Sequence, residues 1–336
     1  MDFAFSDDQR LFQQTVRELF DKECATEHVR AAWASDDGRV AGVWSKLAEI
    51  GVVGLMAPEG EGGMGLDDVD LVLLLEESGR SGLCDPLVEN AAVAVPLLRD
   101  GGDGEWLSRL ASGDALAAVG FASEPYVVAA GAADVLLLLG ARDEVWAVPT
   151  GEVATKEEPA LDRGRRLFRV SWSPGSGTCL ARGADARALA DAAFDRAALG
   201  TAAQLVGLAD RMIEITAEYA KEREQFGKPI GSFQAVKHHL ANALLKLEFA
   251  RPAVYRAAHS IATDSPDRAR DVSMAKVFAG EAGLLAAKVG LQVHGAIGYT
   301  WEHDLHLFVK PAWARAAAYG DIAWHRARVA RCLGLA

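Results

Sequence analysis

The stretch "KEREQFGKPIGSFQ", Lys221–Gln234, separates two long segments of helical periodicity. Gly227 suits the C-terminal end of a helix, and Pro229 prevents that helix from continuing. Ser232 suits the N-cap of the next helix. The stretch therefore predicts a short junction between two helices of a helical domain.

Arg223 and Phe226 are not explained by the break itself. An arginine near a helix C-terminus complements the helix dipole, which stabilises the helix by about 0.3–1 kcal/mol. Alternatively, its planar and permanently charged guanidinium binds a phosphate or pyrophosphate, with the nearby aromatic side chain packed against a ring. Local chemistry alone favours the first interpretation and leaves the second open. Gln234 follows at the head of the next helix.

The periodicity on both sides of this junction predicts a helical bundle over residues 186–336. Apolar residues recur at alternating intervals of three and four. They are Leu205, Leu208, Met212, Ile215 and Tyr219 before the junction, and Phe233, Val236, Leu240, Leu244 and Leu247 after it. Two further helices are expected over residues 267–294 and 303–331. Four long amphipathic helices with short connections form an antiparallel four-helix bundle.

The N-terminal part, residues 1–114, is predicted to be a helical domain. Ser6 and Gln9 have the spacing of a capping box at the start of the first helix. Further helices are expected in "VWSKLAEIG", "VDLVLLLEESGR" and "NAAVAVPLLRD".

The middle of the chain, residues 115–185, changes to short strand-like runs separated by turns. These runs are "ADVLLLLGA", "EVWAVPT", "RLFRVSW" and "TCLARG". They predict a small β-barrel-like domain, so the fold class is mainly α with a small central β domain.

Composition excludes several classes of function. The net charge is −12, with acidic residues spread along the whole chain, which argues against a nucleic-acid partner. The four cysteines have no CxxC spacing, so neither a zinc site nor a disulfide framework is expected, and a reducing cytoplasm is the simplest location. No run is long and apolar enough for a membrane span. His303, Asp304 and His306 are not spaced for one helical face, so no metal site is expected.

A second junction, "GLQVHGAIGYTWEHD", runs from Gly290 to Asp304. Its glycines allow close approach of the backbone and unusual φ angles. Gln292 offers an amide. His294 is either a ligand-facing imidazole or a structural histidine, and both interpretations stay open.

Together the two junctions carry a resemblance to the acyl-CoA dehydrogenase family of flavoproteins, over nearly the full length. "WSKLAEIGVVGLMAPEGEGGMGLDDVDLVLLLEESGR" resembles the N-terminal signature of that family. "REQFGKPIGSFQ" resembles its R-x-x-F-G-x-x-I-x-x-F-Q motif, and "QVHGAIGYT" resembles its Q-x-x-G-G-x-G-[YF] motif.

The resemblance implies that FAD is the cofactor, held largely by a neighbouring subunit. It places Arg223 at the pyrophosphate, Phe226 near the adenosine and Gln234 in the same region. In the Q-x-x-G-G motif, Ala296 stands where the family has its second glycine. The implied cofactor-binding residues are Arg223, Phe226, Gln234, Gln292, Val293, His294, Gly295 and Ala296.

The chain departs from the family at the catalytic base. The family reaction removes the α-proton of an acyl-CoA with a glutamate held at one of two positions. Here one of them aligns with Ala197 and the other with Tyr319 or, alternatively, Ala318. Asp195 and Asp321 each lie two residues from one of these positions and are the only candidates for a displaced base. The β domain keeps Ser123-Glu124-Pro125 of the flavin-lining T-E-P-x-x-G-S-D-like loop but loses its Gly-Ser pair.

These departures favour a subunit that contributes FAD contacts to a catalytic partner but has no base of its own. The chain resembles the short subunit of actinobacterial heteromeric acyl-CoA dehydrogenases of sterol side-chain degradation. The implied partners are an acyl-CoA substrate, a homologous subunit in a heterotetramer (otherwise a homotetramer), and electron-transfer flavoprotein or a similar acceptor. The alternative is a self-sufficient flavoenzyme with Asp195 or Asp321 as base.

Overall fold

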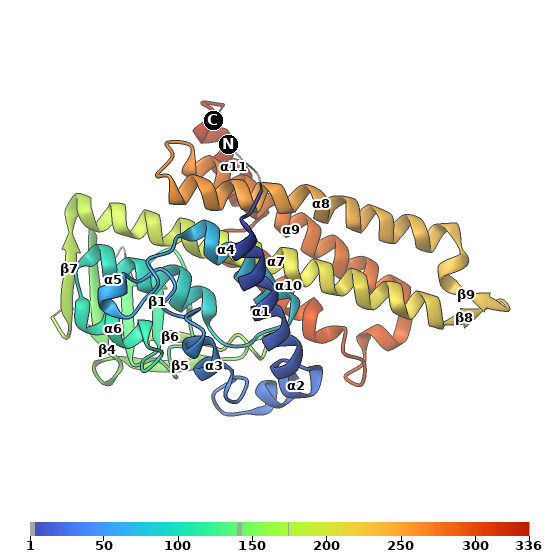
Figure 1. The fold of residues 1–336 in the computed structure, drawn as a ribbon, viewed down its shortest axis with the longest axis horizontal. Coiled ribbons are helices and arrows are strands. Elements are labelled where there is room, and N and C mark those ends of the chain that lie inside the picture. Colours follow the sequence, from blue (N-terminus) through green and yellow to red (C-terminus); the bar gives the residue numbers. More distant parts are fainter. Residues whose placement is uncertain (1–3, 140–142, 174, 336) are drawn as a thin grey trace. The chain divides into compact units, whose positions relative to one another are not determined.

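The computed structural model describes residues 4–139, 143–173 and 175–335. Helices come first along the chain, then strands, then long helices (Figure 1), which confirms the predicted mainly-α fold class. None of the helices in these three ranges is both long and apolar enough to cross a membrane.

The N-terminal region is helical, as expected. Its elements are α1 (Asp7–Glu23), α2 (Thr26–Ala34), α3 (Val43–Glu49), the 3₁₀ turn η1 (Glu59–Glu61), α4 (Asp68–Arg80), the π-helical turn η2 (Val88–Ala94), α5 (Val95–Gly101) and α6 (Gly104–Ala111). The capping box at the start of α1 is confirmed, because Ser6 Oγ accepts from the Gln9 N–H and the Gln9 side chain accepts from the Ser6 N–H.

The turn η2 interrupts the α-helix that "NAAVAVPLLRD" predicts. The buried Asn90 side chain lies in this turn and exchanges two hydrogen bonds with the backbone of Ala117, at 2.8 and 3.0 Å. This side chain links η2 to the first strand of the β region.

The β region forms two small sheets over a shared apolar core. Its strands are β1 (Ala117–Phe121), β2 (Val127–Val128), β3 (Val135–Leu139), β4 (Glu144–Pro149), β5 (Ala154–Glu158), β6 (Leu167–Ser171) and β7 (Thr178–Arg182). One sheet has the order β1-β3-β4-β7 and the other β2-β6-β5. Leu136, Trp146 and Val148 anchor the core, against which Phe168 packs. All four predicted strand-like runs contain a strand; Gly140 and Ala141, at the end of the first run, lie outside the described residues.

The C-terminal region consists of long helices. They are α7 (Gly183–Glu222), α8 (Gln234–Ala262), α9 (Arg268–His294), the 3₁₀ turn η6 (Gly295–Tyr299), α10 (His306–Ala317) and α11 (Ile322–Cys332). The helix α9 packs against α8, α10 and α11, and α8 and α9 run side by side in Figure 1.

The single helix predicted over 303–331 is wrong, because α10 ends at Ala317 and α11 begins at Ile322. The buried ammonium of Lys276 stabilises the break. It donates to the carbonyl oxygens of Arg315 (3.0 Å) and Ala316 (3.2 Å), which the end of α10 leaves without helical partners, and to that of Gly320 (3.0 Å) in the connection.

The junction at Lys221–Gln234 is also built differently from the sequence-based expectation. The strands β8 (Glu224–Gln225) and β9 (Lys228–Pro229) form a hairpin after α7, so Gly227 lies in a hairpin turn rather than at a helix end. Ser232 lies in the 3₁₀ turn η5 (Ile230–Ser232). Phe233 occupies the N-cap position of α8 without a side-chain cap.

The chain folds into two compact units that do not follow the order of the sequence. The first combines residues up to Glu27 with Val72–Leu83 and the chain from Thr201 onward, and the second combines His28–Leu71 with Cys84–Gly200. The helices α4 and α7 each contribute residues to both. The domain limits expected from sequence, at 114 and 185, stay a prediction.

Within the first unit, α4 and α7 approach each other through glycines. A Cβ atom added to Gly207 would lie 1.9 Å from the carbonyl oxygen of Glu76, and one added to Gly79 would lie 2.1 Å from that of Gln204. Real Cβ atoms do not come this close to backbone oxygen. The contact therefore requires glycine at both positions.

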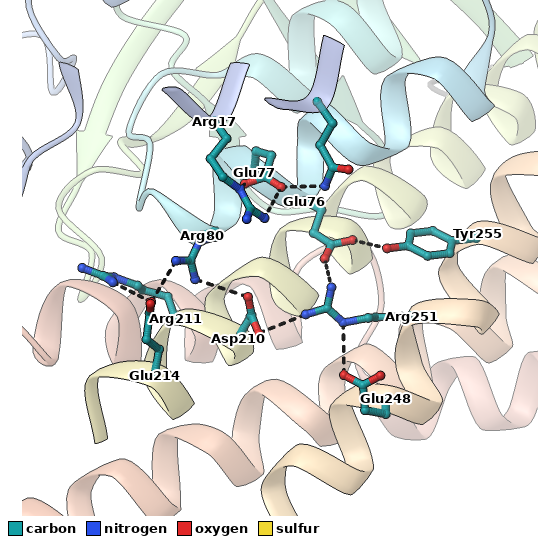
Figure 2. Close-up of polar contacts among 11 residues, drawn as sticks. Arg17, Glu76, Glu77, Arg80, Asp210, Arg211, Glu214, Glu248, Arg251 and Tyr255 are labelled. Atoms are coloured by element: carbon teal, nitrogen blue, oxygen red, sulfur yellow. Dashed lines mark hydrogen bonds and ion pairs between the residues drawn. The ribbon is translucent and has the colours of Figure 1, made fainter. Parts of the chain in front are cut away.

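A network of charged groups surrounds this contact, with partners from α1, α4, α7 and α8 (Figure 2). Glu76, only 3% exposed, accepts from Arg251 (2.5 Å) and from the Tyr255 hydroxyl (2.7 Å). Arg251 also pairs with Asp210 (3.0 Å). Arg80 pairs with the same aspartate at 3.3 Å.

The neighbouring carboxylate, Glu77, fixes the N-terminal helix. It accepts two hydrogen bonds from Arg17, at 2.7 and 2.9 Å, and one from the Gln13 amide at 2.7 Å. Glu76 and Glu77 thus face different partners, and Arg80 continues the network one turn later. The "EESGR" segment, Glu76–Arg80, therefore has a structural role in this unit.

Burial is the largest influence on the Glu76 carboxyl and raises its pKa, against the lowering effect of Arg251 and of the Tyr255 hydrogen bond. The pKa of the Tyr255 hydroxyl is raised as well, first by burial and then by the Glu76 charge. A raised pKa in the folded state means that the ionised carboxylate opposes folding as the pH rises through that value. The charge of Arg251 stabilises the ionised form of Glu76 and so offsets part of the cost of burying it at neutral pH.

We expect Gly207→Ala to destabilise the protein by about 1–3 kcal/mol, because the added methyl meets backbone that cannot move aside. The intrinsic gain in helix propensity, about 1 kcal/mol, would be outweighed. Urea unfolding followed by circular dichroism measures the change. Gly283→Ala is the matched control on α9, because its methyl would meet only the end of the Leu205 side chain. Equal stability of the two variants would contradict the close backbone contact.

Replacing Arg251 by leucine should lower the free energy of unfolding by about 3–5 kcal/mol at pH 7, since Glu76 would stay buried without its cation. The loss should shrink as the pH falls, because burial raises the pKa of the Glu76 carboxyl and a protonated carboxyl needs no cation. The double variant Glu76→Leu/Arg251→Leu should lose less than Arg251→Leu alone. A loss that does not depend on pH would show that the ionised Glu76 does not cause it.

Candidate functional site

The β8–β9 hairpin presents Arg223 and Phe226 at the end of α7. The N–H of Arg223 donates to the carbonyl oxygen of Tyr219 (2.9 Å), and the Arg223 carbonyl accepts from the Ile230 N–H (2.8 Å). Both backbone groups of Arg223 are thus hydrogen-bonded, and its side chain is exposed.

Phe226 lies at the tip of the hairpin in a left-handed conformation. Its φ is 54° and that of Gly227 is 77°. Two consecutive residues with positive φ are what a two-residue type I′ turn requires, and a bulky side chain is disfavoured there. The ring is 91% exposed and meets Phe233 edge-on at 6.0 Å. Neither hydrophobic burial nor backbone preference accounts for phenylalanine at this position.

Three of the predicted cofactor-binding side chains are polar, exposed and without a side-chain hydrogen bond or ion pair to any described residue. They are Arg223, Gln234 and Gln292. Among the residues that the structure describes, none forms a side-chain hydrogen bond or ion pair with them. An arginine and two amides left unpaired on the surface are available for a ligand or for a neighbouring subunit.

The second junction follows directly after α9. Gly295, with φ 65°, ends the helix and turns the chain into η6. Gly295 and Ala296 are exposed, whereas Val293 is half-buried. The open surface at this junction is therefore formed by backbone and small side chains, which allows close approach of another molecule.

His294 differs from its neighbours, since it is only 4% exposed. Its ring stacks on Tyr219, with 4.2 Å between centroids and 22° between planes. The structure therefore brings the end of α9 against the end of α7, and with it the two predicted cofactor-binding segments. Burial lowers the pKa of His294. Tyr219 was expected only as a core residue of the apolar stripe, and no local signal indicates that it joins the two segments.

These residues fit the cofactor that the resemblance implies. A free guanidinium suits a pyrophosphate, an exposed aromatic ring suits a purine, and exposed glycine backbone suits close contact with phosphate or ribose. The fit rests on exposed side chains that form no side-chain hydrogen bond or ion pair with the described residues. Whether each residue touches FAD stays a prediction.

Neither aligned base position offers a carboxylate in the structure. Ala197 lies fully buried on α7, and Tyr319 is buried between α10 and α11 with φ 52°. The first candidate for a displaced base, Asp195, is fully buried on α7.

The second candidate, Asp321, has a structural task. Its carboxylate is the N-cap of α11 and accepts from the Trp324 N–H at 2.8 Å. Asp321 is therefore already used in a way that any helix start would explain.

The predicted β-domain loop lies between β1 and β2. Ser123 and Pro125 are exposed, and Glu124 donates its N–H to the Phe121 carbonyl oxygen in a tight turn. Val128 and Ala129 stand where the family loop carries its Gly-Ser pair, and Val128 lies in β2.

Other site types find no support in residues 4–139, 143–173 and 175–335. No group of three or more His, Cys, Asp or Glu side chains in these ranges could hold a metal ion. Cys24, Cys84, Cys179 and Cys332 form no disulfide bond with one another.

Comparison with known proteins extends the similarity to most of the chain. The family model described as the acyl-CoA dehydrogenase N-terminal domain matches residues 6–114, and the model of the C-terminal domain matches residues 187–334. The acyl-CoA dehydrogenase IpdE2 of Mycolicibacterium smegmatis is 36% identical over 316 residues, covering 94% of this chain and 95% of that protein. Acyl-CoA dehydrogenase FadE27 of Mycobacterium tuberculosis is 30% identical, with 98% of each chain covered.

Solved structures of the same family also superpose on this chain. The crystal structure of the ChsE4–ChsE5 complex from Mycobacterium tuberculosis contains a chain that superposes with a TM-score of 0.91 at 27% identity, covering all of both chains. Butyryl-CoA dehydrogenase from Megasphaera elsdenii superposes with a TM-score of 0.88 at 21% identity, covering 99% of this chain and all of the other, and so shares the fold. On this evidence, the chain belongs to the acyl-CoA dehydrogenase family.

Proposed function

We propose that this chain is the base-free subunit of a heteromeric, FAD-dependent acyl-CoA dehydrogenase, and that it contributes FAD contacts across a subunit interface. The observation that carries the proposal is the set of exposed, unpartnered side chains Arg223, Gln234 and Gln292. Exposed polar groups of this kind are open to a cofactor that is held mainly by a neighbouring subunit.

The reaction is the α,β-dehydrogenation of an acyl-CoA thioester. FAD, when bound, supplies the acceptor for the β-hydride. Arg223 would hold the pyrophosphate with charge-assisted hydrogen bonds, and Phe226 would pack against the adenosine. The Gly295–Ala296 backbone would approach the same cofactor. The α-proton would be taken by a carboxylate of the partner subunit, because Ala197 and Tyr319 have none.

The two-chain ChsE4–ChsE5 complex supports a heteromeric assembly for this chain, since one of its chains is similar over the full length. From the resemblance to the heteromeric enzymes of sterol side-chain degradation, the substrate would be a steroid-derived acyl-CoA. Electrons would leave to electron-transfer flavoprotein or a similar acceptor. A cytoplasmic location, suggested by cysteines that form no disulfide bond, belongs to the same proposal.

The alternative is a self-sufficient enzyme with a displaced base. We expect Asp321→Asn to leave turnover by the assembled complex unchanged, because asparagine replaces aspartate well as an N-cap. Asp195→Asn tests the other candidate. A loss of turnover of a hundredfold or more in either variant, with FAD retained, would support a displaced base and contradict the proposal.

The chain should be purified alone and together with a homologous subunit that carries the family glutamate. We expect FAD and turnover only in the co-purified complex. In that complex, Arg223→Gln should weaken FAD binding by about 10- to 100-fold, corresponding to about 1.5–3 kcal/mol for a hydrogen bond to a charged group. Lys221→Gln is the charge-matched control, since Lys221 already pairs with Glu218. Strong FAD binding and turnover by the chain alone would overturn the proposal.

Phe226→Asn separates binding from folding. Asn-Gly is the preferred pair for a type I′ turn, so the hairpin should be at least as stable as in the parent chain. FAD retention by the complex should nevertheless fall, because the exposed ring is lost. Thermal unfolding measures the stability of the variant, and flavin absorbance measures how much FAD the complex retains. A variant that is destabilised but keeps FAD would show that Phe226 serves the fold instead.

A further inference from the structure

Two segments whose first residues are 72 positions apart in the sequence are joined by one pair of stacked rings. These are the hairpin that begins at Arg223 and the loop that begins at Gly295. The Tyr219 carbonyl oxygen accepts from the Arg223 N–H (2.9 Å), so the tyrosine holds the start of the hairpin. The Tyr219 ring stacks on His294, which is the last residue before Gly295.

The hydrogen bonds of His294 define which of its nitrogens carries the proton. Nδ1 lies 2.8 Å from the carbonyl oxygen of Gly290. A carbonyl can only accept, so Nδ1 donates and the neutral ring has its lone pair on Nε2. Nε2 is buried and has no hydrogen-bond partner within the described chain. A proton added there would have no acceptor.

The stack is enclosed on its other sides as well. The His303 ring meets His294 edge-on at 4.6 Å and meets Tyr219 edge-on at 6.1 Å. The Nδ1 atom of His303 accepts from the Leu305 N–H at 3.1 Å. A Cβ atom on Gly298 would lie 3.0 Å from the His294 Cβ. The histidine is therefore held by α7, by its own loop and by the segment before α10.

We propose that His294 is a positioning residue, which clamps the Gly295–Ala296 loop to the Arg223 hairpin through its stack with Tyr219. This inference rests on the proposed function, since it assigns both segments to one FAD. It also gives buried His294 an indirect role in place of the direct cofactor contact that its motif position suggested.

The clamp should depend on pH. The ionisable groups that face the ring are Tyr219 from α7 and His303 from the segment before α10, and neither offers a carboxylate to a protonated ring. The pKa of His294 is lowered by burial, with a smaller contribution from His303, while the Gly290 carbonyl opposes the shift. A lowered pKa means that the clamp is complete above the ordinary value of 6.5 and weakens as the pH falls below it.

The test uses the co-purified complex, with FAD affinity and hydrogen exchange of residues 219–230 and 290–300 as readouts. His294→Ala should weaken FAD binding about three- to tenfold at pH 8, the range expected for loss of one aromatic stack, and should speed exchange in both segments together. His294→Phe keeps the stack and cannot titrate. It should therefore keep FAD at pH 8 and should lose less FAD than the parent complex at pH 5.5.

Tyr219→Phe should behave like the parent, and His259→Ala is the control for loss of a histidine elsewhere. Parent-like FAD affinity and exchange in His294→Ala would overturn the clamp. If His294→Ala does not fold, His294→Phe decides, and a parent-like loss of FAD at pH 5.5 would overturn the pH dependence. A parent complex without FAD would defeat the proposed function instead, and the joint exchange of the two segments would then test the clamp alone.

Discussion

The contact between α4 and α7 is the constraint on which the first unit depends. Gly79 and Gly207 each face a backbone carbonyl of the other helix at a distance that excludes any side chain. Helices this close place their flanking side chains within reach of one another. The carboxylate of Glu76 is thereby buried, and a buried charge must be paired. Arg251 and its partners meet that requirement by pairing with Glu76, and they are not an independent source of stability.

The same contact fixes the far end of α7. Tyr219 lies twelve residues beyond Gly207, about 18 Å along a helix that rises about 1.5 Å per residue. No proline lies between them. The position of the Tyr219 ring, and hence of the hairpin that starts at Arg223, is set by a packing contact three turns away. A cofactor-facing segment on a hairpin can be placed accurately only if the helix before it is held in this way.

The sequence predicted what depends on local pattern and missed what depends on distant partners. Helical periodicity located α7, α8 and α9, and the capping box located the start of α1. The hairpin was missed because a phenylalanine in the left-handed region, Phe226, carries no local turn signal. The break before α11 was missed although Gly320 and the N-cap Asp321 are local signals for it, and Lys276, which donates hydrogen bonds to carbonyl groups at the break, lies on another helix. The motifs predict which segments hold the cofactor, whereas the stack that joins these segments is seen only in the fold.

The missing base also has a physical rationale. A catalytic carboxylate in an interior position opposes folding, because burial penalises its charged form. Ala197 and Tyr319 place a small apolar and a largely apolar side chain at the two buried positions. The surrounding scaffold is kept, since Lys276 and His325 still hold the backbone of Tyr319 and Gly320 by hydrogen bonds. If the partner subunit supplies the carboxylate, this chain does not bear the cost of burying an ionised group. Its fold does not depend on a carboxylate at either position.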